Sequence, residues 1–202
     1  MADPIEFHFD FISPYAWPGA VEIEKVAARH GREVAWHPML LGISVGKAMG
    51  VKPLLETPLK GDYIRHDVPR VYRYLGLPFR PAVPEFVTSP LAPARIYCWM
   101  REQDEPRARD AARRMLEVHW TEAVDVSKAE NAAAIASEHG FDRAEALAAP
   151  NDPAVKDLLR RAAEDSLARG VFGSPTFVVD GEIFWGADRA PMADRWLAEG
   201  GF

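Results

Sequence analysis

Residues 5–17 read I-E-F-H-F-D-F-I-S-P-Y-A-W, from Ile5 to Trp17. Apolar and polar side chains alternate from Ile5 to Phe11, which is the pattern of a strand with one buried face. Ser13-Pro14 breaks this alternation, because proline cannot donate a hydrogen bond to a sheet but suits the first turn of a helix. The stretch therefore predicts a strand that runs into a helix, with Ser13 at the junction.

A helix and a second strand are predicted directly after this junction. Apolar residues recur at helical spacing from Tyr15 to His30, and Gly31 stands where a helix C-cap is expected. Glu33–Pro38 then reads E-V-A-W-H-P, a short strand that its proline ends. The order strand, helix, strand predicts a pair of parallel neighbouring strands.

The middle of the chain is predicted to be almost entirely helical. Ser127 is expected to cap one helix in a capping box with Glu130, and Asp152 is expected to cap another that opens on Pro153. The predicted helices span residues 66–75, 92–118 with an interruption at Pro106, 127–139 and 152–168.

The C-terminal part returns to strands. Residues 175–180 are apolar and rich in β-formers, and the dipeptide Asp180-Gly181 is a strong hairpin signal before a partner strand at 182–185. A last helix is predicted over 189–198, with Asp188 as its expected N-cap.

This order of elements predicts an α/β protein. Without the helical block, the remaining strands and helices make the four-stranded arrangement of a thioredoxin-like fold, so the block is an all-α helical insertion. We expect residues 1–42 and 170–202 to form one discontinuous thioredoxin-like domain and residues 43–169 to form the helical insertion domain.

Charge and hydropathy exclude several classes of function. The 202 residues carry 24 Lys and Arg against 30 Asp and Glu, which gives a net charge of −6. Such a chain is a poor candidate for binding nucleic acid or an anionic membrane surface, because both need a basic face. We expect a cytoplasmic protein, because the acidic N-terminus resembles no signal peptide and no apolar run approaches the ~20 residues of a membrane span.

The cysteine and histidine content limits the redox and metal chemistry. A single cysteine, Cys98, excludes an intramolecular disulfide, a dithiol redox centre and a multi-cysteine metal site. The six histidines have no metal-ligand spacing, so no metal site is expected. Cys98 lies in an apolar stretch and is expected to be a buried hydrophobic residue rather than a nucleophile.

Ser13 occupies the position where a thioredoxin-like fold places its active pair. At the N-terminus of a helix, free N–H groups and the helix dipole stabilise an anion such as a thiolate. A serine there cannot exchange disulfides, but its hydroxyl can donate a hydrogen bond to the thiolate of another molecule. The alternative is that Ser13 only caps the helix.

The second candidate site is the stretch G-V-F-G-S-P-T-F from Gly170. X-Pro at the start of this strand is the usual place of a cis-proline in thioredoxin-like folds, and we favour that reading for Pro175. A cis turn would leave the backbone of Ser174 free to pair with an extended peptide. The alternative is a trans proline that opens an edge strand.

Four motifs together resemble one family. They are F-D-F-I-S-P-Y-A-W from Phe9, P-L-K-G-D-Y-I from Pro58, the stretch from Gly170, and W-G-A-D-R from Trp185. In this order they resemble the 2-hydroxychromene-2-carboxylate isomerase and kappa-class glutathione transferase family, a DsbA-like branch of the thioredoxin superfamily. The resemblance implies glutathione as cofactor, Ser13 as the catalytic residue that activates its sulfur, and a homodimer.

The resemblance also implies a set of glutathione-binding residues. Lys60 matches a lysine that contacts the ligand, and Ser174 with Pro175 matches the turn whose backbone pairs with the tripeptide. Ala187 and Asp188 match the turn that receives the γ-glutamyl end. A lysine, a helix N-terminus and an aspartate complement the two carboxylates and one ammonium of glutathione. Lys60 could instead be a solvated surface lysine, and Asp188 only an N-cap.

The expected substrate site departs from the family at one position. Val51 stands where the family often has an asparagine that touches the ligand, and valine has no hydrogen-bonding side chain. The adjacent Lys52 could bind a substrate carboxylate. Trp17 and Tyr63, with Trp36 and Trp185, could line a pocket for an aromatic substrate or could equally be core residues.

These observations favour a glutathione-dependent isomerase of the 2-hydroxychromene-2-carboxylate type, acting on a small aromatic or electrophilic substrate. Two alternatives stay open: a kappa-class-like glutathione transferase, and a non-catalytic module that binds glutathione or a peptide. The substitution at Val51 favours the non-catalytic module.

Overall fold

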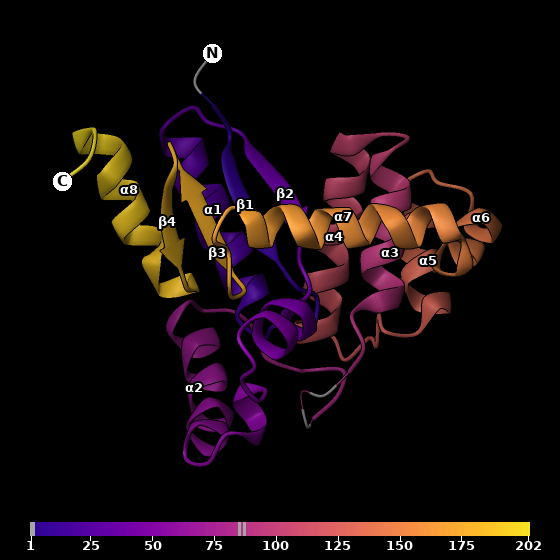
Figure 1. Cartoon of the computed structure of the whole chain (residues 1–202), viewed down its shortest axis with the longest axis horizontal. Coiled ribbons are helices and arrows are strands. Elements are labelled where there is room, and N and C mark those ends of the chain that lie inside the picture. Colours follow the sequence, from indigo (N-terminus) through magenta and orange to yellow (C-terminus); the bar gives the residue numbers. More distant parts are fainter. Residues whose placement is uncertain (1–2, 85, 87) are drawn as a thin grey trace.

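The computed structural model describes residues 3–84, 86 and 88–202. It contains a four-stranded sheet with the strand order β2-β1-β3-β4 (Figure 1). The strands are β1 (Ile5–Phe9), β2 (Val34–Pro38), β3 (Thr176–Val179) and β4 (Glu182–Trp185).

The pairing of the strands agrees with the sequence pattern. β1 runs parallel to β2 and antiparallel to β3, and β3 pairs with β4 as an antiparallel hairpin. Asp180 and Gly181 turn the hairpin with φ values of 51° and 88°, the left-handed conformations that a two-residue hairpin turn requires. β1 ends at Phe9 rather than at the predicted Phe11, because the chain turns away from the sheet at Asp10.

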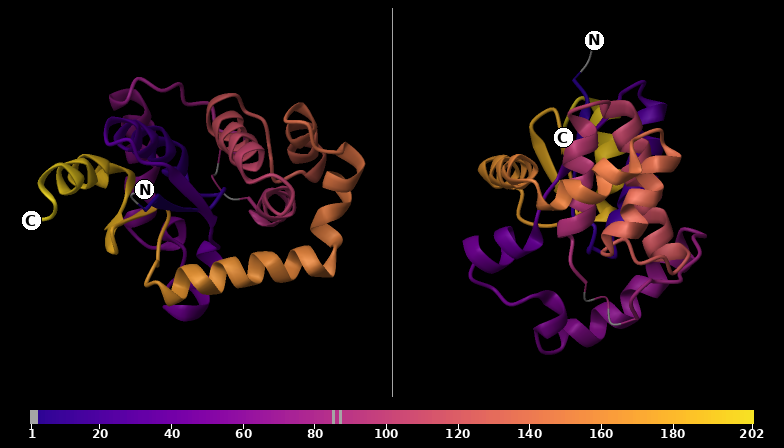
Figure 2. Two further views of the ribbon diagram at one scale, coloured as in Figure 1. Left: turned by 90° about the horizontal axis from the view of Figure 1, so that it is seen from above. Right: turned by 90° about the vertical axis from the view of Figure 1, so that its right-hand side faces the viewer.

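Helices cover both faces of the sheet. α1 (Ala16–Arg29) and α8 (Ala190–Glu199) lie on one face, and α7 (Pro153–Ala168) crosses the other. Seen from above, α7 runs as a long rod from the end of the sheet to the far helices (Figure 2).

Apart from α7, the helices between β2 and β3 form two separate groups. A bundle of α3, α4, α5 and α6 stands beside the sheet, whereas α2 lies apart, beyond one end of it (Figure 1). This arrangement confirms the thioredoxin-like fold with a helical insertion. Besides α7, the helices of the insertion are α2 (Lys60–Tyr74), α3 (Leu91–Arg101), α4 (Glu105–Thr121), α5 (Ala129–Glu138) and α6 (Arg143–Ala148). Shorter turns are the π-helix η1 (Gly42–Ala48) and the 3-10 helices η2 (Leu54–Glu56), η3 (Ala149–Asn151) and η4 (Ala187–Arg189).

Two predicted helix caps are wrong. The hydroxyl of Ser127 donates to Asp125 at 2.6 Å, and the helix begins two residues later at Ala129. The second error is at Asp188, which lies inside η4, so that Arg189 takes the N-cap position of α8. In both cases the polar residue belongs to a short turn before the helix, so it does not cap the helix.

Other caps follow the sequence. Asp152 accepts a hydrogen bond from the Ala154 amide at 2.8 Å and begins α7, as predicted. Pro106 lies in the first turn of α4, which explains the predicted interruption there. α6 was not predicted; its N-cap Asp142 accepts a hydrogen bond from the Glu145 amide.

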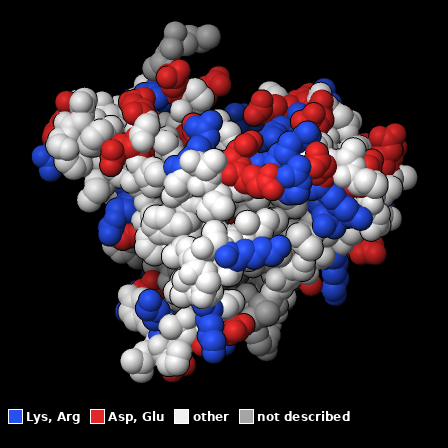
Figure 3. Space-filling model, in the orientation of Figure 1, with Lys and Arg blue, Asp and Glu red and all other residues white. Residues whose placement is uncertain are grey.

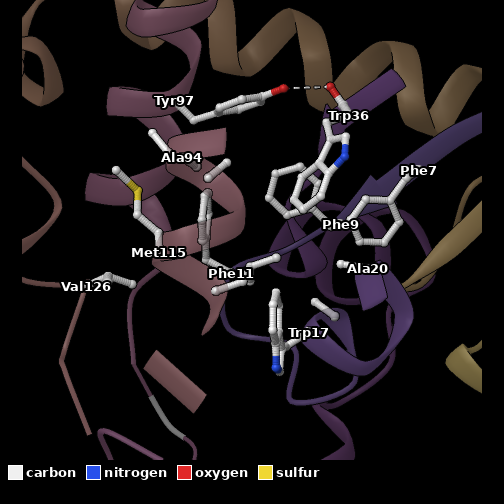
Figure 4. Close-up of a cluster of buried hydrophobic side chains, with 14 of the residues drawn as sticks. Phe7, Phe9, Phe11, Trp17, Ala20, Trp36, Ala94, Tyr97, Met115 and Val126 are labelled. Carbon is white, nitrogen blue, oxygen red and sulfur yellow. Dashed lines mark hydrogen bonds between the residues drawn. The ribbon is translucent and has the colours of Figure 1, made fainter. Parts of the chain in front are cut away.

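The main core lies between the sheet, α1 and the bundle. Phe7 and Phe9 of β1 meet the ring of Trp36 edge-on, at centroid distances of 4.7 and 5.0 Å. Tyr97 of α3 donates its hydroxyl to the Trp36 carbonyl at 2.9 Å, which joins the bundle to β2 (Figure 4). All four of these aromatic residues are buried, so one apolar core holds the sheet and the insertion together.

Cys98 lies in this core, one residue after Tyr97. Its side chain is 1% exposed, and burial raises the pKa of the thiol to about 12. This confirms that it is a buried hydrophobic residue. None of the helices in the described part of the chain is both long and apolar enough to cross a bilayer.

Candidate functional site

Three segments meet at one end of the sheet, where β1 and β4 end and β3 begins (Figure 1). The Ser13 hydroxyl donates to the Ser174 carbonyl at 2.8 Å, and the Asp10 amide donates to the Ser174 hydroxyl oxygen at 2.8 Å. The structure thus brings together the two candidate motifs around Ser13 and Ser174, which are 161 residues apart.

The side chain of Ser13 does not cap α1. That helix begins at Ala16 with Tyr15 at the N-cap position, and it has no side-chain cap. The interpretation of Ser13 as a simple helix cap is therefore wrong. Its hydroxyl is 2% exposed and committed to Ser174, so a ligand that reaches it must displace that hydrogen bond.

The peptide bond between Ser174 and Pro175 is cis, as favoured from the sequence. Gly19 of α1 allows this turn to pack closely, because a Cβ there would lie 2.7 Å from Pro175 Cγ. The Pro175 carbonyl accepts from the Gly186 amide at 2.9 Å, which holds the turn of Ala187 beside the cis-proline. Gly19, Pro175 and Gly186 therefore pack together at this end of the sheet.

Asp10 is a buried carboxyl that the sequence reading did not single out. Its Oδ2 accepts from the Leu41 amide at 2.7 Å, and its Oδ1 accepts from the Ile12 amide at 3.1 Å. Burial raises the pKa of this carboxyl to about 6, against the opposing effect of the two backbone donors. Asp10 joins the loop that carries Ser13 to the segment that leads into η1. An aspartate inside the apolar stretch F-D-F was the signal that could have found it.

α2 is tied to the Ser13 loop by two tyrosines. The Tyr15 hydroxyl donates to Asp67 at 2.8 Å, and the Tyr72 hydroxyl donates to the Pro14 carbonyl at 3.0 Å. Asp67 also accepts from Tyr63 at 3.1 Å and from Arg70. Asp67 thus connects the start of α1 to the helix that lies beyond this end of the sheet.

The charged candidate residues are all exposed. Lys60 lies on α2 and Lys52 on the segment before it, whereas Asp188 lies in η4. Lys60 is the first residue of α2 and is exposed, and Lys52 is exposed beside Val51, which is 47% exposed. Asp188 is exposed and pairs with Arg189 at 2.9 Å. Lys60 begins the helix that lies beyond the same sheet end as Ser13. Among the residues that the structure describes, no hydrogen bond or ion pair joins Lys60 or Lys52 to Ser13.

The four aromatic residues considered for a substrate pocket do not come together. Trp17 and Trp36 are 3% and 1% exposed and belong to the core (Figure 4), where the Arg113 guanidinium lies 5.2 Å from the Trp17 ring. Tyr63 is 58% exposed and bound to Asp67. Trp185 is 49% exposed and projects from the outer strand β4.

This sheet end places a hydroxyl donor, Ser13, beside the backbone carbonyl that precedes the cis-proline. A serine hydroxyl next to a helix N-terminus can donate to an anion, and the carbonyl of Ser174 can accept from a peptide N–H. No thiol of the chain lies here, because its single cysteine is in the core.

Comparisons with known proteins agree with this arrangement. The family described as "DSBA-like thioredoxin domain" matches residues 4–198. The chain is 25% identical to a 2-hydroxychromene-2-carboxylate isomerase of Sphingobium xenophagum, over 98% of this chain and 100% of that protein. It is 26% identical to glutathione S-transferase kappa 2 of Caenorhabditis elegans, over 96% of this chain and 92% of that protein. A solved structure of 2-hydroxychromene-2-carboxylate isomerase has the same fold, with a TM-score of 0.82 and 23% identity over 96% of this chain and 94% of that one.

Proposed function

The chain belongs to the family of DsbA-like thioredoxin domains, and we propose that it is a glutathione-dependent isomerase in which Ser13 activates the ligand's thiol. The observation that carries the proposal is the contact of Ser13 with Ser174 beside a cis-proline, in a chain that has no thiol at this position. The names of the relatives, isomerases and glutathione transferases, support a reaction that uses glutathione.

The Ser13 hydroxyl has one proton and at present donates it to Ser174. On binding, the cysteine of glutathione would pair with the Ser174 backbone, and the hydroxyl would turn to donate to the sulfur. A hydrogen bond to the anion favours the thiolate over the thiol and lowers the pKa of the bound sulfur. The start of α1 adds the favourable field of its N-terminus.

The thiolate would then act as the nucleophile. It forms a carbon–sulfur bond to the electrophilic carbon of a conjugated carbonyl compound, and the electron pair of the carbon–carbon double bond moves toward the carbonyl oxygen. The former double bond can now rotate. Return of the electrons expels the thiolate and restores the double bond in its new geometry, so glutathione is regenerated and no oxidant is consumed.

Charged residues around the sheet end would hold the rest of glutathione. We expect Lys60 to bind a carboxylate and Asp188, with the Ala187 turn, to bind the γ-glutamyl ammonium end. Because both charged side chains are exposed, each contributes a screened and modest interaction. Lys52 beside Val51 would contact the substrate, and we expect the protein to act as a dimer of two such chains.

The decisive experiment compares wild type with Ser13→Ala. We expect glutathione to bind both proteins with similar affinity by calorimetry, because its backbone contacts remain. The pKa of the bound thiol, followed by thiolate absorbance, should rise in the variant, and isomerisation of 2-hydroxychromene-2-carboxylate should slow at least about tenfold. Ser137→Ala, on the exposed side of α5, is the matched control and should leave both values unchanged.

The same measurements separate the alternatives. A glutathione transferase would convert an aryl halide to a stable conjugate and would leave the chromene unchanged. A binding module would bind glutathione and turn over neither compound. Equal isomerisation rates with and without glutathione, or an unimpaired Ser13→Ala variant, would contradict the proposal.

A further inference from the structure

An uncharged patch with exposed aromatic rings lies beside the candidate site, on the face of the sheet that α7 crosses. Side chains alternate along a strand, so Ile183 and Trp185 of β4 point to this face. They are 36% and 49% exposed, and Phe172, which follows α7, is 37% exposed. In the space-filling view of this side, mostly uncharged surface surrounds a basic side chain in the middle (Figure 3).

Phe172 and Trp185 form one corner of this patch. Their ring centroids are 4.8 Å apart, and their planes meet at 62°. Trp185 packs directly on Gly173, where a Cβ would lie only 2.3 Å from its Nε1 atom. Gly170 lies at an ordinary contact distance from Ile183, and its φ of 81° favours a glycine there. Gly173 thus allows the segment before the cis-proline to pack closely against Trp185 of β4.

This corner adjoins the site of the proposed reaction. Phe172 precedes Ser174 by two residues, and Trp185 stands opposite Thr176 in the β3–β4 register. The Gly186 amide, next to Trp185, donates to the Pro175 carbonyl. The rings are therefore anchored to the same cis-proline turn that accepts the hydroxyl of Ser13.

The chemistry of the corner selects a class of ligand. Two aromatic rings set edge to face offer an apolar wall to a third flat ring, which can stack on one and meet the edge of the other. Neither ring carries charge, and rings held by close packing lose little conformational freedom when a ligand binds. An aliphatic or strongly charged group would gain less from the same wall.

We propose that Phe172 and Trp185 are a specificity-determining platform for an aromatic ring carried on, or attacked by, the glutathione sulfur. The inference rests on the proposed glutathione-dependent function. It assigns the aromatic part of the substrate to the α7 side of the sheet end, away from Trp17 and Tyr63.

The test uses two stable conjugates that differ only at sulfur, S-methylglutathione and S-benzylglutathione. Calorimetry on wild type should give about tenfold tighter binding of the benzyl compound. In Trp185→Ala the preference should fall to about twofold, while the affinity for the methyl compound stays the same. Phe172→Ala should lose part of the preference, and Trp185→Phe should keep most of it.

Tyr74→Ala is the matched control, because Tyr74 is 87% exposed at the far end of α2. It should retain the full preference. The platform is overturned if wild type binds both compounds equally, if Trp185→Ala keeps the preference, or if it weakens both compounds to the same extent. Failure of wild type to bind glutathione and both conjugates overturns the proposed function together with the platform.

Discussion

The two faces of the sheet differ in what they bury. The face toward α1 holds only apolar side chains from the two central strands, among them Phe7, Phe9 and Phe177. The face toward α7 holds His8 and Thr176, both 1% exposed, although they alternate with the residues of the apolar core. One face is closed by packing, and the other is closed by packing and hydrogen bonds together.

The polar face is organised around His8. Its Nδ1 lies 2.9 Å from the Ser166 hydroxyl on α7, and its Nε2 lies 3.0 Å from Glu6. The ring stacks on His37 of β2 at 4.9 Å. Burial lowers the pKa of His8 and of His37 to about 4, so both are neutral at neutral pH.

The difference shows that the stability of the α1 face depends on packing volume, whereas the stability of the α7 face also depends on pH. Apolar contacts do not titrate, so the α1 face should resist changes of pH. The α7 face buries groups that a change of pH can charge, and a buried charge is costly. Substitutions that remove volume should therefore destabilise the α1 face, and acidification should destabilise the α7 face.

The largest expected effect is a cavity on the apolar face. Phe9→Ala removes a ring that contacts Phe7, Phe11, Trp36 and Tyr97, and we expect it to lower the free energy of unfolding by about 4 kcal/mol. Urea unfolding at pH 7 measures this loss. The exposed Tyr74→Ala should change stability by less than about 0.5 kcal/mol, and a similarly small loss for Phe9→Ala would contradict the assignment of this core.

The second effect is acid destabilisation through the α7 face. A histidine whose folded pKa is about 4 against 6.5 when unfolded contributes stability that is present above pH 6.5 and lost as the pH falls toward 4. For one such residue the loss from pH 7 to 4 is about 3 kcal/mol. His37→Gln should remove that part of the pH dependence, as measured by urea unfolding across this range; an unchanged slope would refute it.

Asp10, at the sheet end, should act in the opposite direction. Burial raises its pKa to about 6 in the folded protein, against 3.8 for an ordinary aspartate, so the folded state prefers the protonated form. Its contribution to stability is present below pH 3.8 and lost as the pH rises through 6, by about 2–3 kcal/mol. Asp10→Asn should therefore show less loss of stability than wild type between pH 4 and 7, whatever its absolute stability. Parallel curves for the two proteins would contradict this.

The smallest effect concerns the link between α2 and the Ser13 loop. Asp67→Asn weakens the hydrogen bonds from Tyr15 and Tyr63 and the ion pair with Arg70, most of which is exposed, so we expect a loss of about 1 kcal/mol. If α2 positions Lys60 for the ligand, the glutathione affinity should fall more than stability does. Arg160→Gln, which breaks an exposed ion pair on α7, is the control and should leave glutathione binding unchanged.

The sequence predicted what local pattern determines. Alternation located β1, the dipeptide at Asp180 located the hairpin, and two short motifs located Ser13 and the cis turn at Pro175. Each of these depends on a few neighbouring residues and on strong rules for proline, glycine and strand periodicity. The division into two domains at residues 43 and 170, and the roles of the site residues, stay predictions.

Contacts between distant segments could not be predicted in the same way. His8 looks like an ordinary polar residue of an alternating strand until α7 brings Ser166, 158 positions later, against it. Asp10 links two segments only because the fold brings the Leu41 amide within hydrogen-bond distance of its carboxylate. Ser127 and Asp188 carry a cap signature, but the turns before α5 and α8 place other residues at the cap.

Because Cys98 is buried, the native protein should not react with thiol reagents. Its sulfur is 1% exposed, and a thiol with a pKa of about 12 holds almost no thiolate at neutral pH. The folded protein should therefore resist alkylation and should form no mixed disulfide with oxidised glutathione. A colorimetric thiol count taken on the native protein with bound ligand would then report the ligand's sulfur alone, and the appearance of a second reactive thiol would mark unfolding of the bundle.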